Sequence, residues 1–293
     1  MTHEMTTRPT VAVLGVGLMG LPMSRRLRSA GFNVRVWNRN AQKAAPVVAE
    51  GATLASTPGE AAAGADFVLT MLPDGAAVES VMIGPDGVLS TLGSDATWLQ
   101  MSSVGMEWAE RLGHLVEGTA INFVDAPVSG SVGPAETGQL LILASGPSGV
   151  RDKATPLFDV LGRRTYWLGD AGAGSRAKLV LNNWLVDLVE SVAETLRFTR
   201  ALGLDPHTLV DILSDAPIGS PYAVAKARQM LAGEYAPSFA LKTALKDADL
   251  ALEAAGQLGT TLLLTDSFID SWHRAVSQGL GDSDLSVVFD SAS

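Results

Sequence analysis

Cysteine is absent from the 293-residue chain, basic residues are fewer than acidic ones, and long apolar runs are missing. The lack of cysteine excludes a disulfide framework and thiolate chemistry, and it leads us to expect a cytoplasmic protein. With 21 Lys and Arg against 31 Asp and Glu, the net charge is -10. That balance argues against nucleic acid or a membrane as a partner, because such binding depends on many basic contacts with phosphate.

No apolar run reaches the roughly 20 residues of a membrane span, and MTHEMTTRPT lacks the apolar core of a signal peptide. Hydrophobic residues make up 47% of the chain and charged residues 18%, as in a folded protein long enough for two domains. No histidine has a second ligand at metal spacing, so we predict no metal site; the histidines are His3, His114, His207 and His273.

The pattern of apolar residues changes near residue 170. Before it, β-rich runs such as TVAVLG, NVRVWN and DFVLTML alternate with helical segments, which is typical of βαβ units and a mostly parallel sheet. From LVLNNW onward, apolar residues recur at helical spacing instead. We therefore predict an α/β domain over residues 1–171 and an all-α domain over 172–293, joined by a long inter-domain helix.

A glycine motif follows the first predicted strand. In GVGLMG, Gly15, Gly17 and Gly20 match G-x-G-x-x-G, and Leu18 and Met19 complete the loop. The first glycine allows a tight turn, the second lets the backbone approach a pyrophosphate, and the third lets helix and strand pack closely. A chance match would be a mere turn, but the position between a strand and a helix favours a Rossmann-type dinucleotide site.

The second predicted strand ends in VRVWNRN, so Asn38, Arg39 and Asn40 stand where an NAD site usually offers an acidic residue to the ribose. Arginine suits a 2′-phosphate, whereas a carboxylate would repel it. This favours NADP as the cofactor, with NAD as the alternative. The competing interpretation is that Arg39 is an ordinary solvated charge.

Two further segments combine small or polar residues with apolar surroundings. DAPVSGSVGPAETG leaves main-chain N–H groups and the Ser129 hydroxyl able to bind an anionic group, although a functionless turn explains this stretch equally well. In GAGSRAKLVLNNW, Lys178 and Asn182 lie four positions apart and share one helix face. In isolation this pair also fits a lysine that reaches solvent along an apolar helix and an asparagine that packs between domains.

With these motifs in order, and with TMLPDGAAVESVMIG and LKDADLAL, nearly the whole chain resembles the β-hydroxyacid dehydrogenase family, which includes 3-hydroxyisobutyrate dehydrogenases and the glyoxylate/succinic semialdehyde reductases. The resemblance implies hydride exchange between a nicotinamide and a small β-hydroxy acid or its semialdehyde. It also implies that Lys178 is the catalytic acid/base and that Asn182 is the substrate-orienting amide. Ser129, Gly130 and Ser131 would bind the substrate carboxylate. The residues implied at the cofactor are Lys246 and Asp247, near the nicotinamide, and Leu72, Pro73 and Ser102.

The chain departs from the family pattern at three positions. Ser131 stands where a second glycine is common, and Gln139 where a threonine is common. Gln100 stands where an aspartate is frequent. Ser131 could change the shape around the carboxylate, so the particular acid is left open.

Two other functions remain as alternatives. An imine reductase on the same architecture generally has another residue at the Lys178 position, and a non-catalytic NADP-binding interaction module typically loses the lysine. The lysine therefore argues against both. The helical domain is rich in apolar residues, and with the family resemblance this predicts a homodimer or homotetramer.

Overall fold

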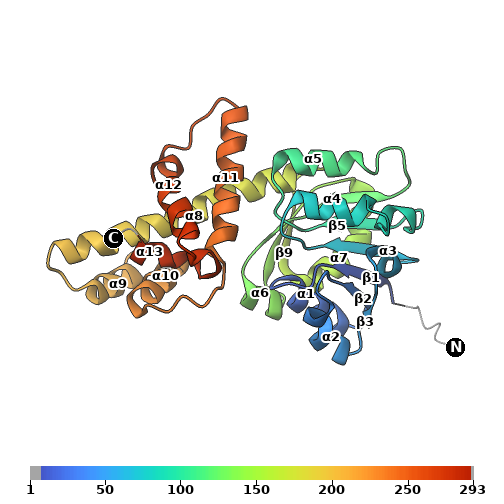
Figure 1. Ribbon diagram of the computed structural model, residues 1–293, viewed down its shortest axis with the longest axis horizontal. Coiled ribbons are helices and arrows are strands. Elements are labelled where there is room, and N and C mark those ends of the chain that lie inside the picture. Colours follow the sequence, from blue (N-terminus) through green and yellow to red (C-terminus); the bar gives the residue numbers. More distant parts are fainter. Residues whose placement is uncertain (1–7, 292–293) are drawn as a thin grey trace. The chain divides into compact units, whose positions relative to one another are not determined.

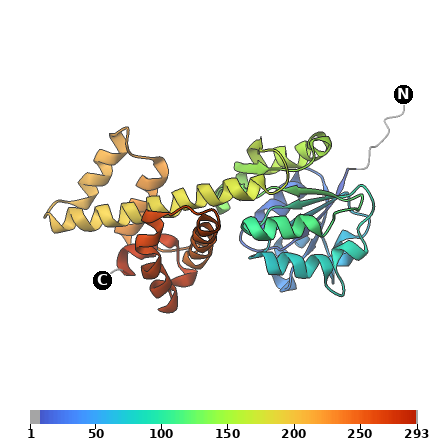
Figure 2. The same cartoon turned by 90° about the horizontal axis from the view of Figure 1, so that it is seen from above.

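The computed structural model describes residues 8–291 and divides into two compact units, Met1–Lys178 and Leu179–Ser293. Figures 1 and 2 show the first unit as strands flanked by helices and the second as helices alone. One helix, α8 (Ala173–Ala201), contributes residues to both units. No helix within the described part of the chain is long and apolar enough to cross a membrane.

The first unit is built on a six-stranded parallel sheet with the order β3-β2-β1-β4-β5-β6. This order places β1 at the point where the chain changes direction across the sheet, the position at which doubly wound folds bind ligands. The strands are β1 (Thr10–Leu14), β2 (Asn33–Trp37), β3 (Thr53–Leu54), β4 (Phe67–Thr70), β5 (Thr97–Gln100) and β6 (Asn122–Asp125).

Both faces of this sheet are covered, as the side chains of β1 show. Val11 and Val13 belong to one hydrophobic cluster, while Ala12 and Leu14 belong to a second cluster on the other face. Because successive side chains of a strand point to opposite faces, a strand buried on both sides must be apolar throughout. The covering helices are α1 (Gly20–Ser29), α2 (Ala45–Ala49), α3 (Pro58–Ala62), α4 (Gly75–Ile83), α5 (Met106–His114), α6 (Val132–Thr137) and α7 (Arg151–Leu161).

A smaller sheet follows in the same unit. Its strands are β7 (Val128–Ser129), β8 (Leu140–Ala144) and β9 (Gly162–Trp167); β7 pairs antiparallel with β8, and β8 pairs parallel with β9. The backbone of Asp125, at the end of β6, also pairs with that of Ser145 just after β8. This pairing joins the two sheets at the ends of β6 and β8.

The second unit packs helices around a core that contains the fully buried Trp272. Its indole Nε1 donates a hydrogen bond of 2.8 Å to Glu190 on α8, and Glu190 also pairs with Arg197 at 2.7 Å. The helices after α8 are α9 (Pro206–Asp215), α10 (Pro221–Ala232), α11 (Leu241–Gln257), α12 (Leu263–Ser277) and α13 (Val288–Ser291).

The predicted fold class is confirmed: a mostly parallel α/β sheet domain precedes an all-helical domain. The segments TVAVLG, NVRVWN and DFVLTML, expected as strands, contain β1, β2 and β4. Two short strands, β3 and β7, were not predicted. The compact units separate between Lys178 and Leu179, whereas the predicted domain boundary at 171/172 precedes the inter-domain helix.

Candidate active site

The three motif glycines occupy two kinds of environment, one crowded and one open. A Cβ at Gly15, where φ is +102°, would lie 2.2 Å from the Met71 carbonyl oxygen, and one at Gly20 would lie 1.8 Å from the Gly15 carbonyl oxygen. Neither position has room for a side chain. A Cβ at Gly17 would meet nothing within 4 Å. The first and third glycines thus allow close packing, and the second leaves open space where a phosphate could approach the backbone.

The end of β2 is tied to this loop through its side chains. Asn38 accepts a hydrogen bond of 3.0 Å from the Val16 N–H and donates one of 2.8 Å to the Asn40 carbonyl. Asn40 caps the short helix that follows by accepting from the Gln42 N–H at 3.1 Å. The intervening Arg39 is exposed, and within residues 8–291 it makes no hydrogen bond or ion pair. Its guanidinium is therefore available to a ligand anion.

The loops after β4 and β5 are linked by Ser102, which is fully buried. Its hydroxyl accepts from the Leu72 N–H at 2.9 Å and donates to the Thr70 carbonyl at 3.3 Å. The Gln100 amide makes two bonds to Ser102 itself, accepting from its N–H at 2.8 Å and donating to its carbonyl at 2.9 Å. Aspartate could supply only the acceptor. Leu72 and Pro73 then lead into α4, beside the glycine loop.

The residues predicted at the substrate carboxylate lie between β7 and α6. Ser129 ends β7 and is half-buried, and Ser131 precedes the first residue of α6. Gly130 has φ of +133°, and a Cβ there would lie 2.9 Å from Leu140 Cδ2. Glycine is therefore required at this point for the chain to turn.

Helix α8 carries the predicted lysine and asparagine on successive turns. Lys178 is half-buried, whereas Asn182 is only 3% exposed. In the helical unit, Asn182 Nδ2 donates a hydrogen bond of 2.5 Å to Asp247 Oδ2 on α11. The other oxygen, Asp247 Oδ1, lies 3.0 Å from Lys246 Nζ, a charge contact without hydrogen-bond alignment. The structure thus brings Asn182, Lys246 and Asp247 together.

This contact was not expected from the sequence. An ionised carboxylate can only accept hydrogen bonds, so the amide group of Asn182 must face Asp247 with its nitrogen. One N–H and the carbonyl oxygen of Asn182 remain for other partners. Asp249, two positions later, lies outside this group and pairs with His273 on α12 at 3.0 Å.

Asn183 has a different environment from its neighbour. Its Nδ2 donates to Asp187 Oδ2 at 3.0 Å, and its oxygen accepts from the Thr265 hydroxyl at 2.8 Å. The Thr265 hydroxyl also lies 2.7 Å from Asp187 Oδ1. These contacts join α8 to α12 within the helical unit, so Asn183 links two helices.

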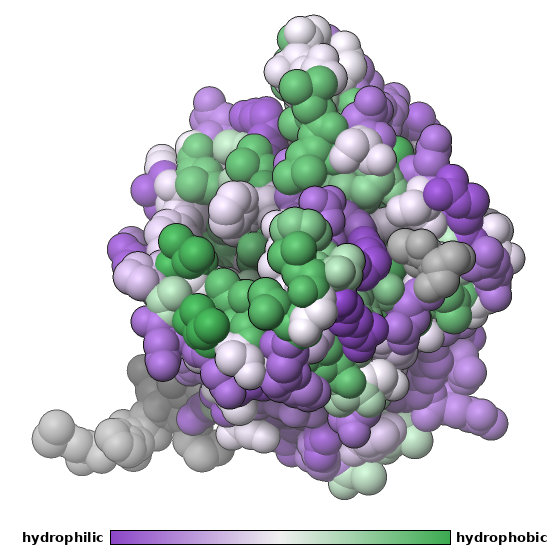
Figure 3. All heavy atoms as spheres, turned by 90° about the vertical axis from the view of Figure 1, so that its left-hand side faces the viewer, coloured by the Kyte–Doolittle hydropathy of each residue, from purple (hydrophilic) through white to green (hydrophobic). Residues whose placement is uncertain are grey.

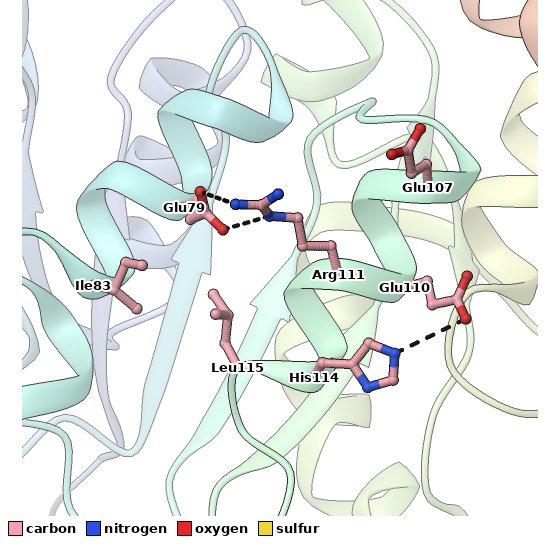
Figure 4. A pocket seen from close by; sticks show the side chains of 7 residues that line it. All are labelled: Glu79, Ile83, Glu107, Glu110, Arg111, His114 and Leu115. Carbon is pink, nitrogen blue, oxygen red and sulfur yellow. Dashed lines mark hydrogen bonds and ion pairs between the residues drawn. The ribbon is translucent and has the colours of Figure 1, made fainter.

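A surface hollow of about 560 Å³ lies on α4 and α5, and Figure 4 shows its lining side chains. Arg111 crosses it to Glu79, with distances of 2.6 and 3.0 Å between their nitrogen and oxygen atoms. Nearby, a hydrogen bond and the charge of Glu117 raise the pKa of His114. None of the predicted site residues lines this hollow, and its basic side chains, Arg111 and His114, already pair with Glu79 and Glu110.

The strand order and the glycine geometry define a Rossmann-type protein that binds NAD(P). Residues 10–169 match the family model described as the NAD binding domain of 6-phosphogluconate dehydrogenase. Residues 172–291 match the model described as NAD-binding of NADP-dependent 3-hydroxyisobutyrate dehydrogenase. The chain belongs to the β-hydroxyacid dehydrogenase family of oxidoreductases, as its motifs predicted.

Relatives of this family cover almost the full length of the chain. Glyoxylate/succinic semialdehyde reductase 1 of Arabidopsis thaliana is 35% identical over 280 residues, which are 96% of this chain and 97% of the relative. The 2-(hydroxymethyl)glutarate dehydrogenase of Eubacterium barkeri is 34% identical, covering 95% and 93% respectively. A structure of Mycobacterium tuberculosis 3-hydroxyisobutyrate dehydrogenase with L-serine has a TM-score of 0.86 at 28% identity, covering 97% of this chain and 99% of that one.

Proposed function

We propose that this protein is an NADP-preferring oxidoreductase that interconverts a small β-hydroxy acid and the corresponding semialdehyde or keto acid. The observation that carries the proposal is the placement of Lys178 and Asn182 on successive turns of α8, with the Asn182 amide bonded to the buried Asp247. A cation and an oriented amide on one helix face can act together on one substrate group.

The cofactor site combines the glycine loop and the end of β2. The open space at Gly17 fits a pyrophosphate against the amino terminus of α1, and the exposed Arg39 fits a 2′-phosphate. Leu72 and Pro73 would line the next part of the cofactor, with Lys246 and Asp247 near its reactive end. Ser102 was expected beside the cofactor as well, but it is fully buried and supports this loop through its bond from the Leu72 N–H. When bound, the nicotinamide supplies or accepts the hydride.

Lys178 is the proton donor in reduction and the acceptor in oxidation. A carbonyl that receives a hydride becomes an alkoxide, so one titratable group must stand beside that oxygen. Asn182 orients the same oxygen through its remaining N–H, while Asp247 holds the amide in place. Because no proton is transferred by the amide, its contribution is smaller than that of Lys178.

Ser129, Gly130 and Ser131 hold the substrate carboxylate through hydroxyl and main-chain N–H groups. The substrates and ligand named for the three relatives, including succinic semialdehyde, 2-(hydroxymethyl)glutarate and L-serine, all carry a carboxylate. This common group supports an acid-binding loop here. The protein's own acid depends on the shape created by Ser131 and Gln139.

The helical unit carries a large exposed apolar surface, which supports a homodimer or homotetramer. Figure 3 shows apolar patches on the end that carries α9. The large apolar residues of this unit that are more than half exposed are Val180, Trp184, Phe198, Leu202, Leu204, Ile212, Ile218, Leu258, Leu263 and Leu264. We also keep 171/172 as the proposed domain boundary, because the two family models match residues 10–169 and 172–291 on either side of it.

The proposal is tested by substituting Lys178. Turnover should be measured first on a panel of small aldehyde acids, ketones and cyclic imines with NADPH, and on hydroxy acids with NADP. On the best substrate, Lys178→Ala should lower kcat by about 10²- to 10⁴-fold with little change in NADPH affinity, since it removes the acid/base group alone. Lys178→Arg should not restore turnover, because a guanidinium does not release its proton at working pH.

Asn182→Ala is the matched variant one turn away, and it should cost less than Lys178→Ala. NADPH binding by fluorescence titration is the control for folding in all three variants. Near-normal kcat in Lys178→Ala would reject the mechanism. Activity confined to cyclic imines would reject the hydroxy-acid substrate class.

A further inference from the structure

Asp125, the last residue of β6, is a fully buried carboxylate to which the proposed function gives no task. Its oxygens accept hydrogen bonds from the Ser175 N–H and the Ser175 hydroxyl, both at 2.7 Å. The Ser145 hydroxyl lies 3.3 Å from the same carboxylate. Burial raises the pKa of Asp125, and the hydrogen bonds from Ser175 and Ser145 oppose that rise. A buried carboxylate is costly, so these contacts must offset its desolvation.

Ser145 completes the arrangement from the other sheet. Its hydroxyl oxygen accepts from the Gly174 N–H at 2.9 Å, and its backbone exchanges two hydrogen bonds with Asp125, at 2.8 and 3.0 Å. The first N–H groups of a helix have no partner within the helix. Here Ser145 and Asp125 accept from two of them, at Gly174 and Ser175.

The first turn of α8 also lies directly against the strands. A Cβ at Gly174 would fall 2.1 Å from the Leu143 carbonyl oxygen and 2.8 Å from the Asp125 carbonyl oxygen. The helix start therefore approaches β6 and the small sheet as closely as a backbone can. Lys178 follows Ser175 by three residues, about 4.5 Å along the helix axis at the usual rise.

We propose that Asp125 is a positioning residue, which together with Ser145 fixes the first turn of α8 and thereby sets the location of Lys178. The inference rests on the proposed role of Lys178. On this proposal, Asp125 at the end of β6 holds the helix that carries the proton donor, and the nearby Ser129 holds the substrate carboxylate. A displacement of about 1 Å at a reacting group can cost roughly 10²-fold in rate, so a small shift of this turn would suffice.

The test compares Asp125→Ala with Asp125→Asn. The alanine variant loses both acceptors, and kcat should fall by roughly 10- to 100-fold while the NADPH dissociation constant is unchanged. Amide hydrogen exchange should become faster over residues 172–178. Asparagine keeps one acceptor for the Ser175 N–H. Asp125→Asn should therefore have a higher kcat than Asp125→Ala, and slower amide exchange over residues 172–178.

Asp205→Ala is the matched control, because Asp205 caps α9 in the same way, accepting from His207 and Thr208 N–H at 3.1 and 3.2 Å. It should leave kcat unchanged. Unchanged kcat in Asp125→Ala, counted per NADPH-binding molecule, would overturn the proposal. So would equal loss in Asp125→Asn and Asp125→Ala, since a role in positioning requires the acceptor and not the charge.

If Asp125→Ala does not bind NADPH, Ser145→Ala decides, because it removes the acceptor for the Gly174 N–H and the hydroxyl contacts with Asp125 but leaves the Asp125 carboxylate in place. A fall in its kcat with NADPH affinity retained supports the proposal, and normal kcat overturns it. Failure of the proposed function is visible separately: Lys178→Ala would then retain turnover, whereas the exchange measurement on Asp125→Ala still reports whether the helix start is held.

Discussion

Lys226→Met should destabilise the helical unit strongly, because it removes the partner of a buried carboxylate. Lys226 on α10 is 4% exposed, and Asp284, just before the C-terminal helices, is fully buried. Their charged atoms lie 2.5 Å apart. Asp284 also holds the segment before α11, where it accepts from the Ser238 N–H at 3.0 Å and the Phe239 N–H at 3.2 Å.

The magnitude follows from what remains after the substitution. Removing one partner of a buried ion pair typically costs about 3 to 5 kcal/mol, because the other charge stays buried and uncompensated. Asp284 would keep its bonds from Ser238 and Phe239, and also those from the Ser286 N–H and hydroxyl, at 3.1 and 2.8 Å. These contacts place the expected loss at the lower end, about 3 kcal/mol in the free energy of unfolding.

The assay is urea denaturation followed by circular dichroism, with Lys242→Met as the control. Lys242 pairs with Asp282 in the same region, but the two side chains are 58% and 87% exposed. An exposed pair contributes about 0 to 1 kcal/mol, so the control should change little. Equal shifts in the two variants, or a loss below about 1 kcal/mol in Lys226→Met, would refute the argument from burial.

The pH dependence provides a second readout. Burial raises the pKa of Asp284, but hydrogen bonds from Lys226 and Ser286 and the charge of Lys226 outweigh it, so the net pKa is lowered. The ionised carboxylate therefore stabilises the fold fully above the ordinary carboxyl pKa, and this contribution is lost as the pH falls through the lowered value. The difference between Lys226→Met and the unaltered protein should shrink in acid.

Two further predictions concern the cofactor and assembly. Arg39→Ala should weaken NADPH binding far more than NADH binding, by about one to two decades in affinity, since one charge-assisted hydrogen bond contributes roughly 1.5 to 3 kcal/mol. Equal catalytic efficiency with both cofactors in the unaltered protein would contradict the assignment. Light scattering at micromolar concentration should give a dimer or tetramer mass, because the exposed side chains of the helical unit, such as Trp184 and Ile218, favour burial. A monomer mass would exclude this assembly.

Most of the fold was predictable because long strands and helices carry their own pattern. β1 is apolar over its buried length, β4 is apolar except for Thr70 at its end, and α9 begins at Pro206 with Asp205 as its cap. The strand β3 carries no such signal. It has two exposed residues, Thr53 and Leu54, and exists because they pair with β2. Pairing between segments distant in sequence does not appear in local periodicity.

The glycine roles in the candidate site were also predictable, because each depends on backbone geometry that the motif specifies. The departure at Gln100 could be seen in the sequence but not explained there. Its reason is that the amide spans the N–H and the carbonyl of Ser102, two residues later. Residue type alone cannot say which groups a buried amide will face, since several nearby groups could satisfy it.

Asn182 shows where the spacing of residues along a helix stops being informative. The four-residue separation from Lys178 predicts a shared helix face, but the group that orients the amide is Asp247, 65 positions away in the chain. Because that carboxylate takes one N–H, the amide can offer the substrate only the other N–H and its oxygen. The orienting role proposed for Asn182 thus depends on Asp247, whose charge is in turn paired with Lys246. Any change at Asp247 would therefore act on the substrate through Asn182, even without direct contact.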